Sequence, residues 1–189
     1  MKYYLVALFN KDSYSHVERI QRDMCRKYKL YRHMPVLHIT LEIIDNPDID
    51  KLTKIVSKFL KPYKEFKVNI NGAICFDPPY KSVNLKIEDK GYIIRLSRQL
   101  NELLRLHKFK VRENIENWDL HISLANTNYA VREWSSKEYV AACQTAKKEN
   151  IHKMITVNRI ALWKPVNNKK EMLIKNFQLR EYEKYPGWF

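Results

Sequence analysis

The sequence Leu-His-Ile-Thr-Leu at residues 37–41 recurs, with one hydroxyl residue changed, as Leu-His-Ile-Ser-Leu at residues 120–124. Apolar residues at the first, third and fifth positions of each copy are typical of a short buried β-strand. Because strand side chains alternate between faces, the histidine and the hydroxyl residue of each copy share one face, and the apolar residues face a core. If the two strands lie side by side, two imidazoles and two hydroxyls converge, which is a set suited to acid–base chemistry on a phosphate.

The pair of copies is more informative than either copy alone. A single His-x-Ser/Thr triplet occurs often by chance, and an isolated copy is best explained as a hydrogen-bonded structural histidine at a strand edge. The shared apolar frame and the equivalent placement of the two copies favour a functional pair instead. The candidate catalytic residues are therefore His38, Thr40, His121 and Ser123.

The chain also divides into two similar halves, preceded by a strand at residues 3–9. The first half predicts, in order, a helix at 13–29 with Ser15 and Glu18 in capping-box spacing, the first motif strand, a helix opened by Asn46-Pro47-Asp48, and strands at about 66–75 and 82–88. The second half predicts a helix at about 91–107, the second motif strand, a helix opened by Ser135 with Glu138, and strands at about 152–163 and 171–180.

This order predicts an α+β protein that folds as a single bilobal domain over residues 1–189. The first pseudo-repeat covers about 10–90 and the second about 91–180. We expect two mainly antiparallel sheets flanked by helices, with a central cleft that carries the two His-x-Thr/Ser strands.

With two such motifs in this element order, the chain resembles the 2H phosphoesterase superfamily, which includes the bacterial RNA 2′,3′-cyclic phosphodiesterases also called 2′-5′ RNA ligases. The resemblance implies that each motif lies on a central strand of one lobe. It also implies that His38 and His121 are the catalytic pair, while Thr40 and Ser123 bind phosphate oxygens. The chain departs from many relatives after the second motif, where residues 125–127 read Ala-Asn-Thr in place of a basic residue.

Two histidines can supply both proton transfers that opening a cyclic phosphate requires, because the ordinary imidazole pKa of about 6.5 makes both protonation states accessible. The leading hypothesis is a metal-independent phosphoesterase that acts on RNA 2′,3′-cyclic phosphate ends or on 2′-5′ phosphodiester linkages, with 2′-5′ ligation as the reverse direction. One alternative is a non-catalytic RNA-binding module of the same fold. Another is a phosphodiesterase for a small cyclic nucleotide or phosphosugar.

Cofactor-dependent classes find no support in the sequence. It has no His-Glu-x-x-His or Cys-x-x-Cys spacing, so we expect no metal. The chain has only 3 glycines, too few to form a P-loop or a dinucleotide-binding fingerprint. We therefore expect no cofactor.

The charge of the chain predicts a polyanionic partner. Lys and Arg number 35 against 21 Asp and Glu, which gives a formal net charge of +14. RNA or a nucleotide with a cyclic or 2′-5′ phosphate fits this excess, although a lysine-rich surface without a partner explains it equally well. Tyr80 with Lys81, and Trp163 with Lys164, pair an aromatic with a cation and are candidate substrate binders, against the simpler explanations of packing and surface exposure.

The cysteines and the amino-terminal residues predict a location. Cys25, Cys75 and Cys143 are odd in number and far apart in sequence, which favours reduced thiols in an intracellular protein. The apolar run at residues 3–9 is too short for a signal peptide or a membrane span. We expect a cytoplasmic monomer without a membrane partner.

Overall fold

The computed structural model describes residues 1–166 and 168–182, and its strands join in one 8-stranded sheet. Within these residues the pairings between the strands are antiparallel. The strands are β1 (Lys2–Phe9), β2 (Ile39–Asp45), β3 (Phe66–Phe76), β4 (Ser82–Ile87), β5 (Lys110–Val111), β6 (His121–Ala125), β7 (His152–Trp163) and β8 (Leu173–Gln178).

The sheet closes on itself through its longest strand. Its order is β1-β2-β6-β4-β3-β7-β8, and β7 also pairs with β1. Residues 152–157 of β7 pair with β3 and residues 157–163 pair with β1, so this 12-residue strand belongs to both halves of the molecule. The predicted α+β class with antiparallel strands is confirmed. The prediction of two separate sheets is wrong, because β7 and the β2–β6 contact join them into one.

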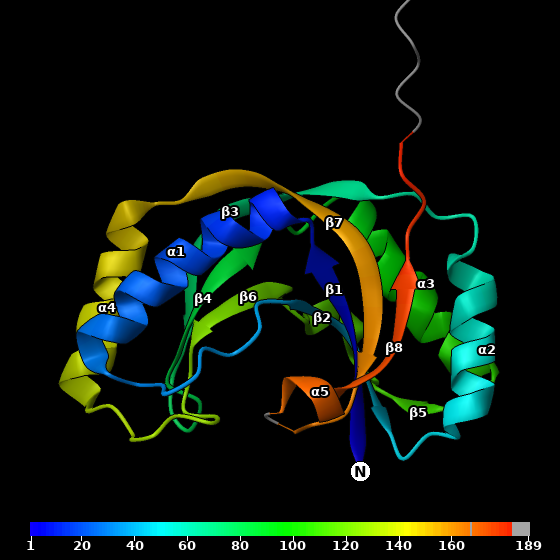
Figure 1. Cartoon of the computed structure of the whole chain (residues 1–189), viewed down its shortest axis with the longest axis horizontal. Coiled ribbons are helices and arrows are strands. Elements are labelled where there is room, and N and C mark those ends of the chain that lie inside the picture. Colours follow the sequence, from blue (N-terminus) through cyan, green and yellow to red (C-terminus); the bar gives the residue numbers. More distant parts are fainter. Residues whose placement is uncertain (167, 183–189) are drawn as a thin grey trace, which may run out of the picture.

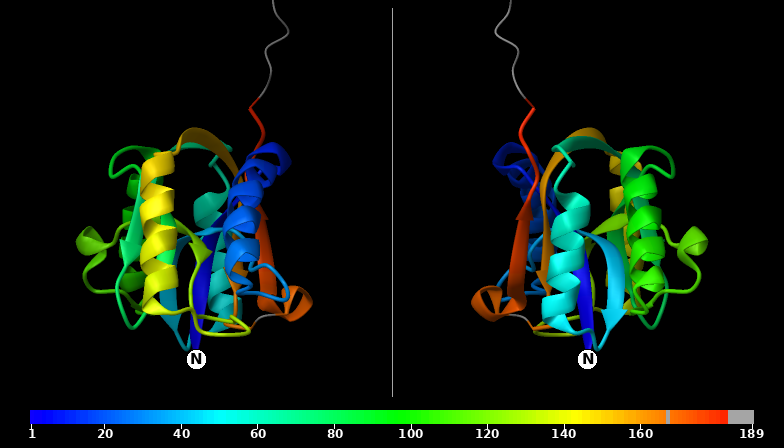
Figure 2. Two further views of the ribbon diagram at one scale, coloured as in Figure 1. Left: turned by 90° about the vertical axis from the view of Figure 1, so that its left-hand side faces the viewer. Right: turned by 90° about the vertical axis from the view of Figure 1, so that its right-hand side faces the viewer.

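The helices lie on the outside of this sheet, in two pairs. In Figure 2, α1 and α4 lie side by side in the left view, and α2 and α3 in the right view. The sheet thus has an outer face that the helices cover and an inner face that they leave free (Figure 1). The helices are α1 (Lys11–Tyr28), α2 (Ile49–Leu60), α3 (Tyr92–Leu106), α4 (Ser136–Glu149), the short α5 (Lys169–Met172) and a 3₁₀ turn at Ile115–Asn117.

The two halves of the sequence exchange their helices. The order helix-strand-helix-strand-strand occurs once as α1-β2-α2-β3-β4 and again as α3-β6-α4-β7-β8. Yet α1 packs against β6 and α4 against β3 and β4, whereas α3 packs against β2 and α2 against β8. One arm of the sheet is therefore β3, β4 and β6 under α1 and α4, and the other is β1, β2 and β8 under α2 and α3. Each predicted pseudo-repeat contributes to both arms.

Helix α1 begins before the predicted capping box. Its N-cap is Asn10, whose side chain accepts the backbone N–H of Ser13, so Ser15 lies inside the helix and does not cap it. Glu18 instead forms an ion pair with Arg22 one turn later. At α4 the sequence pattern holds, because the predicted capping box between Ser135 and Glu138 is formed.

The prediction of three reduced thiols is wrong for two of them. Cys75 at the end of β3 and Cys143 on α4 form a disulfide, with Cα atoms 6.2 Å apart. Their separation of 68 residues concealed this proximity, which arises because α4 packs on β3. Cys25 is free and buried, so the thiols no longer argue for a reducing compartment. In the described part of the chain, no helix has both the length and the apolar character needed to cross a membrane.

Candidate active site

The two motif strands have the alternation that the sequence predicts. The apolar residues of both copies are buried in the core between sheet and helices: Leu37, Ile39, Leu41, Leu120, Ile122 and Leu124. The four candidate catalytic side chains are only partly buried. They therefore lie on the inner face of the sheet, opposite the helices.

The register between β2 and β6 brings the four side chains together. These strands come from different arms and meet at one pair, Ile39 with Ile122. In an antiparallel pair this register places His38 beside Ser123 and Thr40 beside His121. The two histidines are then diagonal neighbours, roughly 7–8 Å apart between backbones.

Both imidazoles are held in the same way. Nδ1 of His38 lies 2.7 Å from the carbonyl oxygen of Val36, and Nδ1 of His121 lies 2.8 Å from that of Asp119. Because a carbonyl oxygen only accepts, Nδ1 carries the hydrogen in each ring. The neutral ring then has its lone pair on Nε2, which is the atom left for proton exchange with a substrate.

An aromatic ring supports each imidazole. Trp163, at the end of β7, packs edge-on against His38 with ring centroids 4.8 Å apart. Phe76, at the end of β3, does the same for His121 at 5.0 Å. Trp163 is only 6% exposed, so its ring forms a wall beside His38 and offers no open stacking surface. The sequence did not single out Phe76, since one aromatic at a strand end resembles any core residue.

Burial lowers the pKa of both histidines below the ordinary 6.5, and the hydrogen bonds to the carbonyls partly oppose this. The neighbouring charge of His121 lowers the pKa of His38 further, whereas the carboxylate of Asp119 raises that of His121. Both rings are therefore mostly neutral at neutral pH, and His121 has the surroundings that better support a proton.

Polar residues of β4 extend the inner face beside the second motif. Lys86 pairs with His121 and Asn84 with Ser123 across the β4–β6 ladder. Asn84 is fully buried, and its Oδ1 has no hydrogen-bond partner among the described residues. The sequence alone could have indicated that these polar side chains share one face, because Ser82, Asn84 and Lys86 alternate with apolar residues along the strand.

The remaining sequence-predicted binders have different environments. Tyr80 is 65% exposed, so its ring is accessible to a ligand. Lys81 is paired with Glu133 at 2.8 Å, which neutralises its charge. Lys164 follows β7 and is partly buried, with its backbone N–H donating to Met172. Among the described residues, no group of three or more His, Cys, Asp or Glu side chains is arranged to hold a metal ion.

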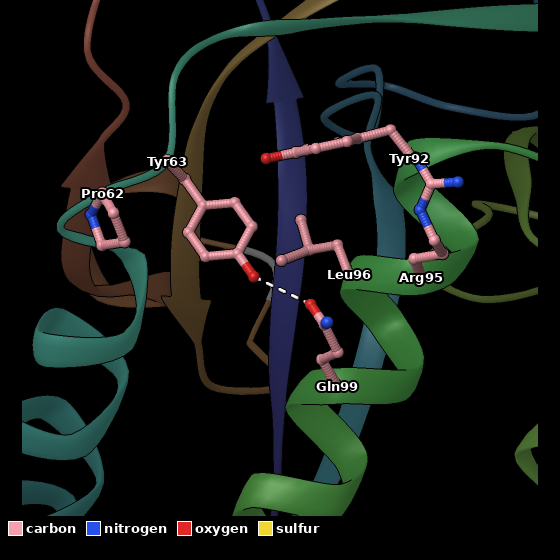
Figure 3. Close-up of a pocket in the computed structure, with 6 residues that line it drawn as sticks. All are labelled: Pro62, Tyr63, Tyr92, Arg95, Leu96 and Gln99. Atoms are coloured by element: carbon pink, nitrogen blue, oxygen red, sulfur yellow. Dashed lines mark hydrogen bonds between the residues drawn. The ribbon is translucent and has the colours of Figure 1, made fainter.

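A cavity of about 380 Å³ lies elsewhere, on the helix side of the sheet (Figure 3). It opens between the α2–β3 connection and α3, and the Tyr63 hydroxyl donates to Gln99 within it at 2.9 Å. Helix α3 covers the outer face of β2, whereas His38 and Thr40 lie on the inner face, so this cavity is separate from the histidines. Its lining residues are Pro62, Tyr63, Tyr92, Arg95, Leu96 and Gln99.

Comparisons with known proteins concern the family and the fold of this chain. The family model described as the 2′-5′ RNA ligase superfamily matches residues 10–169. No curated protein gave a significant match. Among solved structures, TT0787 of Thermus thermophilus is 15% identical with a TM-score of 0.66, over 96% of this chain and 100% of that one. E. coli LigT complexed with 3′-AMP is 11% identical with a TM-score of 0.61, over 94% and 97%. The same LigT complexed with phosphate is 12% identical with a TM-score of 0.54, over 95% and 97%. At these identities the likeness to solved structures concerns the fold.

Proposed function

Because this chain belongs to the 2′-5′ RNA ligase superfamily, we propose that it is a metal-independent phosphoesterase acting on RNA 2′,3′-cyclic phosphate ends or on 2′-5′ phosphodiester linkages. One observation carries the proposal: two imidazoles at the β2–β6 contact, each with Nδ1 bonded to a backbone carbonyl and with Nε2 lacking a hydrogen-bond partner among the described residues. Acid–base catalysis on one phosphate needs two such groups on opposite sides of phosphorus.

The two environments suggest the division of roles in hydrolysis. His38, whose pKa is lowered by burial and further by the charge of His121, accepts a proton from the attacking water at Nε2. His121, near the carboxylate of Asp119, donates a proton from Nε2 to the departing ribose oxygen. One P–O bond to water forms and one P–O bond to ribose breaks, so a cyclic phosphate becomes a monoester. The roles exchange in the ligating direction.

The other inner-face groups suit the phosphate. The hydroxyls of Thr40 and Ser123 can donate to its non-bridging oxygens, where negative charge grows in the transition state. Lys86 also lies beside His121, and its ammonium group forms an ion pair with Asp89 at 3.1 Å. The structural relative LigT is complexed with 3′-AMP and with phosphate in two of its structures, which supports a nucleotide phosphate as the ligand.

The experiment is turnover in excess EDTA. Purified protein is incubated with a nucleoside 2′,3′-cyclic monophosphate, with an RNA ending in that group, and with a 2′-5′ linked dinucleotide. We expect conversion by the wild type, loss of at least about 100-fold in His38→Gln and in His121→Gln, and no change in His107→Gln, whose histidine is exposed and outside the motifs.

Other outcomes separate the alternatives. RNA binding without conversion of any substrate would support the non-catalytic RNA-binding module. Conversion of the mononucleotide alone, with an affinity that barely changes with salt, would support a small cyclic substrate, because RNA binding by a protein with a charge of +14 weakens strongly as salt rises.

A further inference from the structure

The turn after β6 gives Asn126 four hydrogen bonds, and one of them reaches a proposed catalytic hydroxyl. Its amide Nδ2 donates to Ser123 Oγ at 2.8 Å, and its Oδ1 accepts the backbone N–H of Asn128 at 2.8 Å. Its backbone N–H donates to the Tyr31 hydroxyl at 2.8 Å, and its carbonyl accepts from that hydroxyl at 2.5 Å. The backbone and the side chain of Asn126 are thus both fixed.

These partners determine which way the amide points. The backbone N–H of Asn128 can only donate, so the amide atom that it meets is Oδ1 and the atom that meets Ser123 is Nδ2. Nδ2 can only donate, so Ser123 Oγ is the acceptor in their hydrogen bond.

The direction of that bond leaves the hydroxyl hydrogen of Ser123 available. A hydroxyl has one hydrogen and two lone pairs, and the bond from Asn126 occupies a lone pair. Across the described residues, no protein acceptor takes the hydrogen of Ser123. Its side chain lies on the inner face beside His38, where the proposed substrate phosphate would be.

We infer that Asn126 is a positioning residue, which holds the Ser123 hydroxyl so that its hydrogen points to a non-bridging oxygen of the substrate phosphate. The inference rests on the proposed function, which places the phosphate between the histidines. Without the amide, the hydroxyl is free to rotate toward Asn84, which pairs with Ser123 across the β4–β6 ladder and whose buried Oδ1 has no partner in the described part of the chain. A hydrogen bonded to Asn84 is lost to the substrate.

Tyr31, which lies in the segment that leads to the first motif, holds this turn in place through hydrogen bonds. It precedes His38 on the segment between α1 and β2, and its hydroxyl both accepts from and donates to the backbone of Asn126. Burial raises the pKa of Tyr31 to about 12, so it keeps its hydrogen throughout the working range of an enzyme. Its bonds reach only the backbone of Asn126, so Tyr31→Phe separates the fold of the turn from the role of the amide.

The test is a double-mutant cycle with Ser123→Ala, Asn126→Ala and both together, assayed on a nucleoside 2′,3′-cyclic monophosphate. We expect Ser123→Ala to lower kcat about 100-fold and Asn126→Ala about 10-fold. Because Asn126 acts through Ser123, the double variant should match Ser123→Ala within about twofold. Losses that multiply, or an unchanged kcat in Asn126→Ala, overturn the inference.

An isosteric variant and a control sharpen the result. In Asn126→Asp the carboxylate can only accept, so it captures the Ser123 hydrogen, and kcat should fall as far as in Ser123→Ala. Tyr31→Phe should keep kcat within about threefold of wild type, since a loose turn alone does not remove the Nδ2 bond. A loss in Tyr31→Phe equal to that in Asn126→Ala would mean that the turn, and not the amide, matters, and would overturn the inference.

The same proteins distinguish failure of the inference from failure of the proposed function. If the wild type converts no substrate, the proposed function fails, and the cycle is read from the Kd of 3′-AMP instead. Non-additive Kd changes support the orientation of Ser123 toward phosphate, and additive changes overturn it. Absence of both turnover and 3′-AMP binding overturns both. Thermal unfolding of each variant establishes that the compared proteins are folded.

Discussion

Replacing Arg112 by methionine should strongly destabilise the protein, because it leaves a buried carboxylate without its cation. Glu42 is fully buried and accepts from Arg112 Nε at 2.9 Å, from Asn101 Nδ2 at 2.7 Å and from the Ile43 backbone at 2.8 Å. The Arg112 guanidinium also lies over the Trp118 ring, 3.9 Å from its centroid. Removing one partner of a buried ion pair costs about 3–5 kcal/mol.

That cost converts to a change in melting temperature. For a chain of this length each kcal/mol shifts Tm by roughly 2–4 °C, so Arg112→Met should lower Tm by roughly 6–20 °C. Three hydrogen bonds to Glu42 remain, from Asn101 and from the backbone N–H groups of residues 43 and 112, and they place the expected value toward the lower half of this range. Differential scanning calorimetry at pH 7 measures it.

A solvent-exposed pair provides the matched control. Arg98 and Glu116 are 2.6 Å apart, but their side chains are 48% and 67% exposed. Arg98→Met should therefore cost about 0–1 kcal/mol, which is close to the precision of the measurement.

The double variant Glu42→Leu with Arg112→Met isolates the cause. Replacing both charges by apolar groups removes the unpaired carboxylate, so Tm should recover most of the loss. The reasoning is refuted if Arg112→Met shifts Tm no more than Arg98→Met does, or if the double variant is less stable than Arg112→Met.

Three further predictions concern the histidines and the disulfide. Burial lowers the pKa of both His38 and His121, so the free enzyme with one ring protonated and one neutral is most populated below pH 6.5. The pH profile of kcat/KM should therefore be bell-shaped with its maximum below pH 6.5, and a maximum above pH 7 contradicts the assignment. Trp163→Ala should admit water to His38 and raise the pKa of His38 toward 6.5, which moves the acid limb of the kcat/KM profile to higher pH. An NMR titration of the imidazole measures this pKa, and an unchanged value contradicts the role of Trp163 in excluding water from His38. Reduction of the Cys75–Cys143 disulfide should cost about 2–4 kcal/mol, visible as a lower Tm in dithiothreitol, and a double serine variant should show the lower Tm without responding to dithiothreitol.

Part of the candidate site could be predicted from the sequence because its pattern is local. The alternation of five residues placed His38 and Thr40 on one face, and the same alternation placed His121 and Ser123. The supporting groups could not be predicted in this way. Phe76 reaches His121 only because β3 and β6 flank β4, and nothing in its own neighbourhood of sequence indicates that contact.

By itself the sequence determined the order of the longer helices and strands, most of their ends and the direction of the motif side chains, since capping and periodicity act over a few residues. It did not indicate β5, the 3₁₀ turn or α5, which are two to four residues long. Only the tertiary structure decided which elements meet. The closure of the sheet by β7, the exchange of helices between its arms and the disulfide all join segments far apart in the chain. These contacts depend on how whole surfaces of helices and sheet pack against one another. The same packing pairs Ile39 with Ile122, and that pairing brings the two halves of the site together.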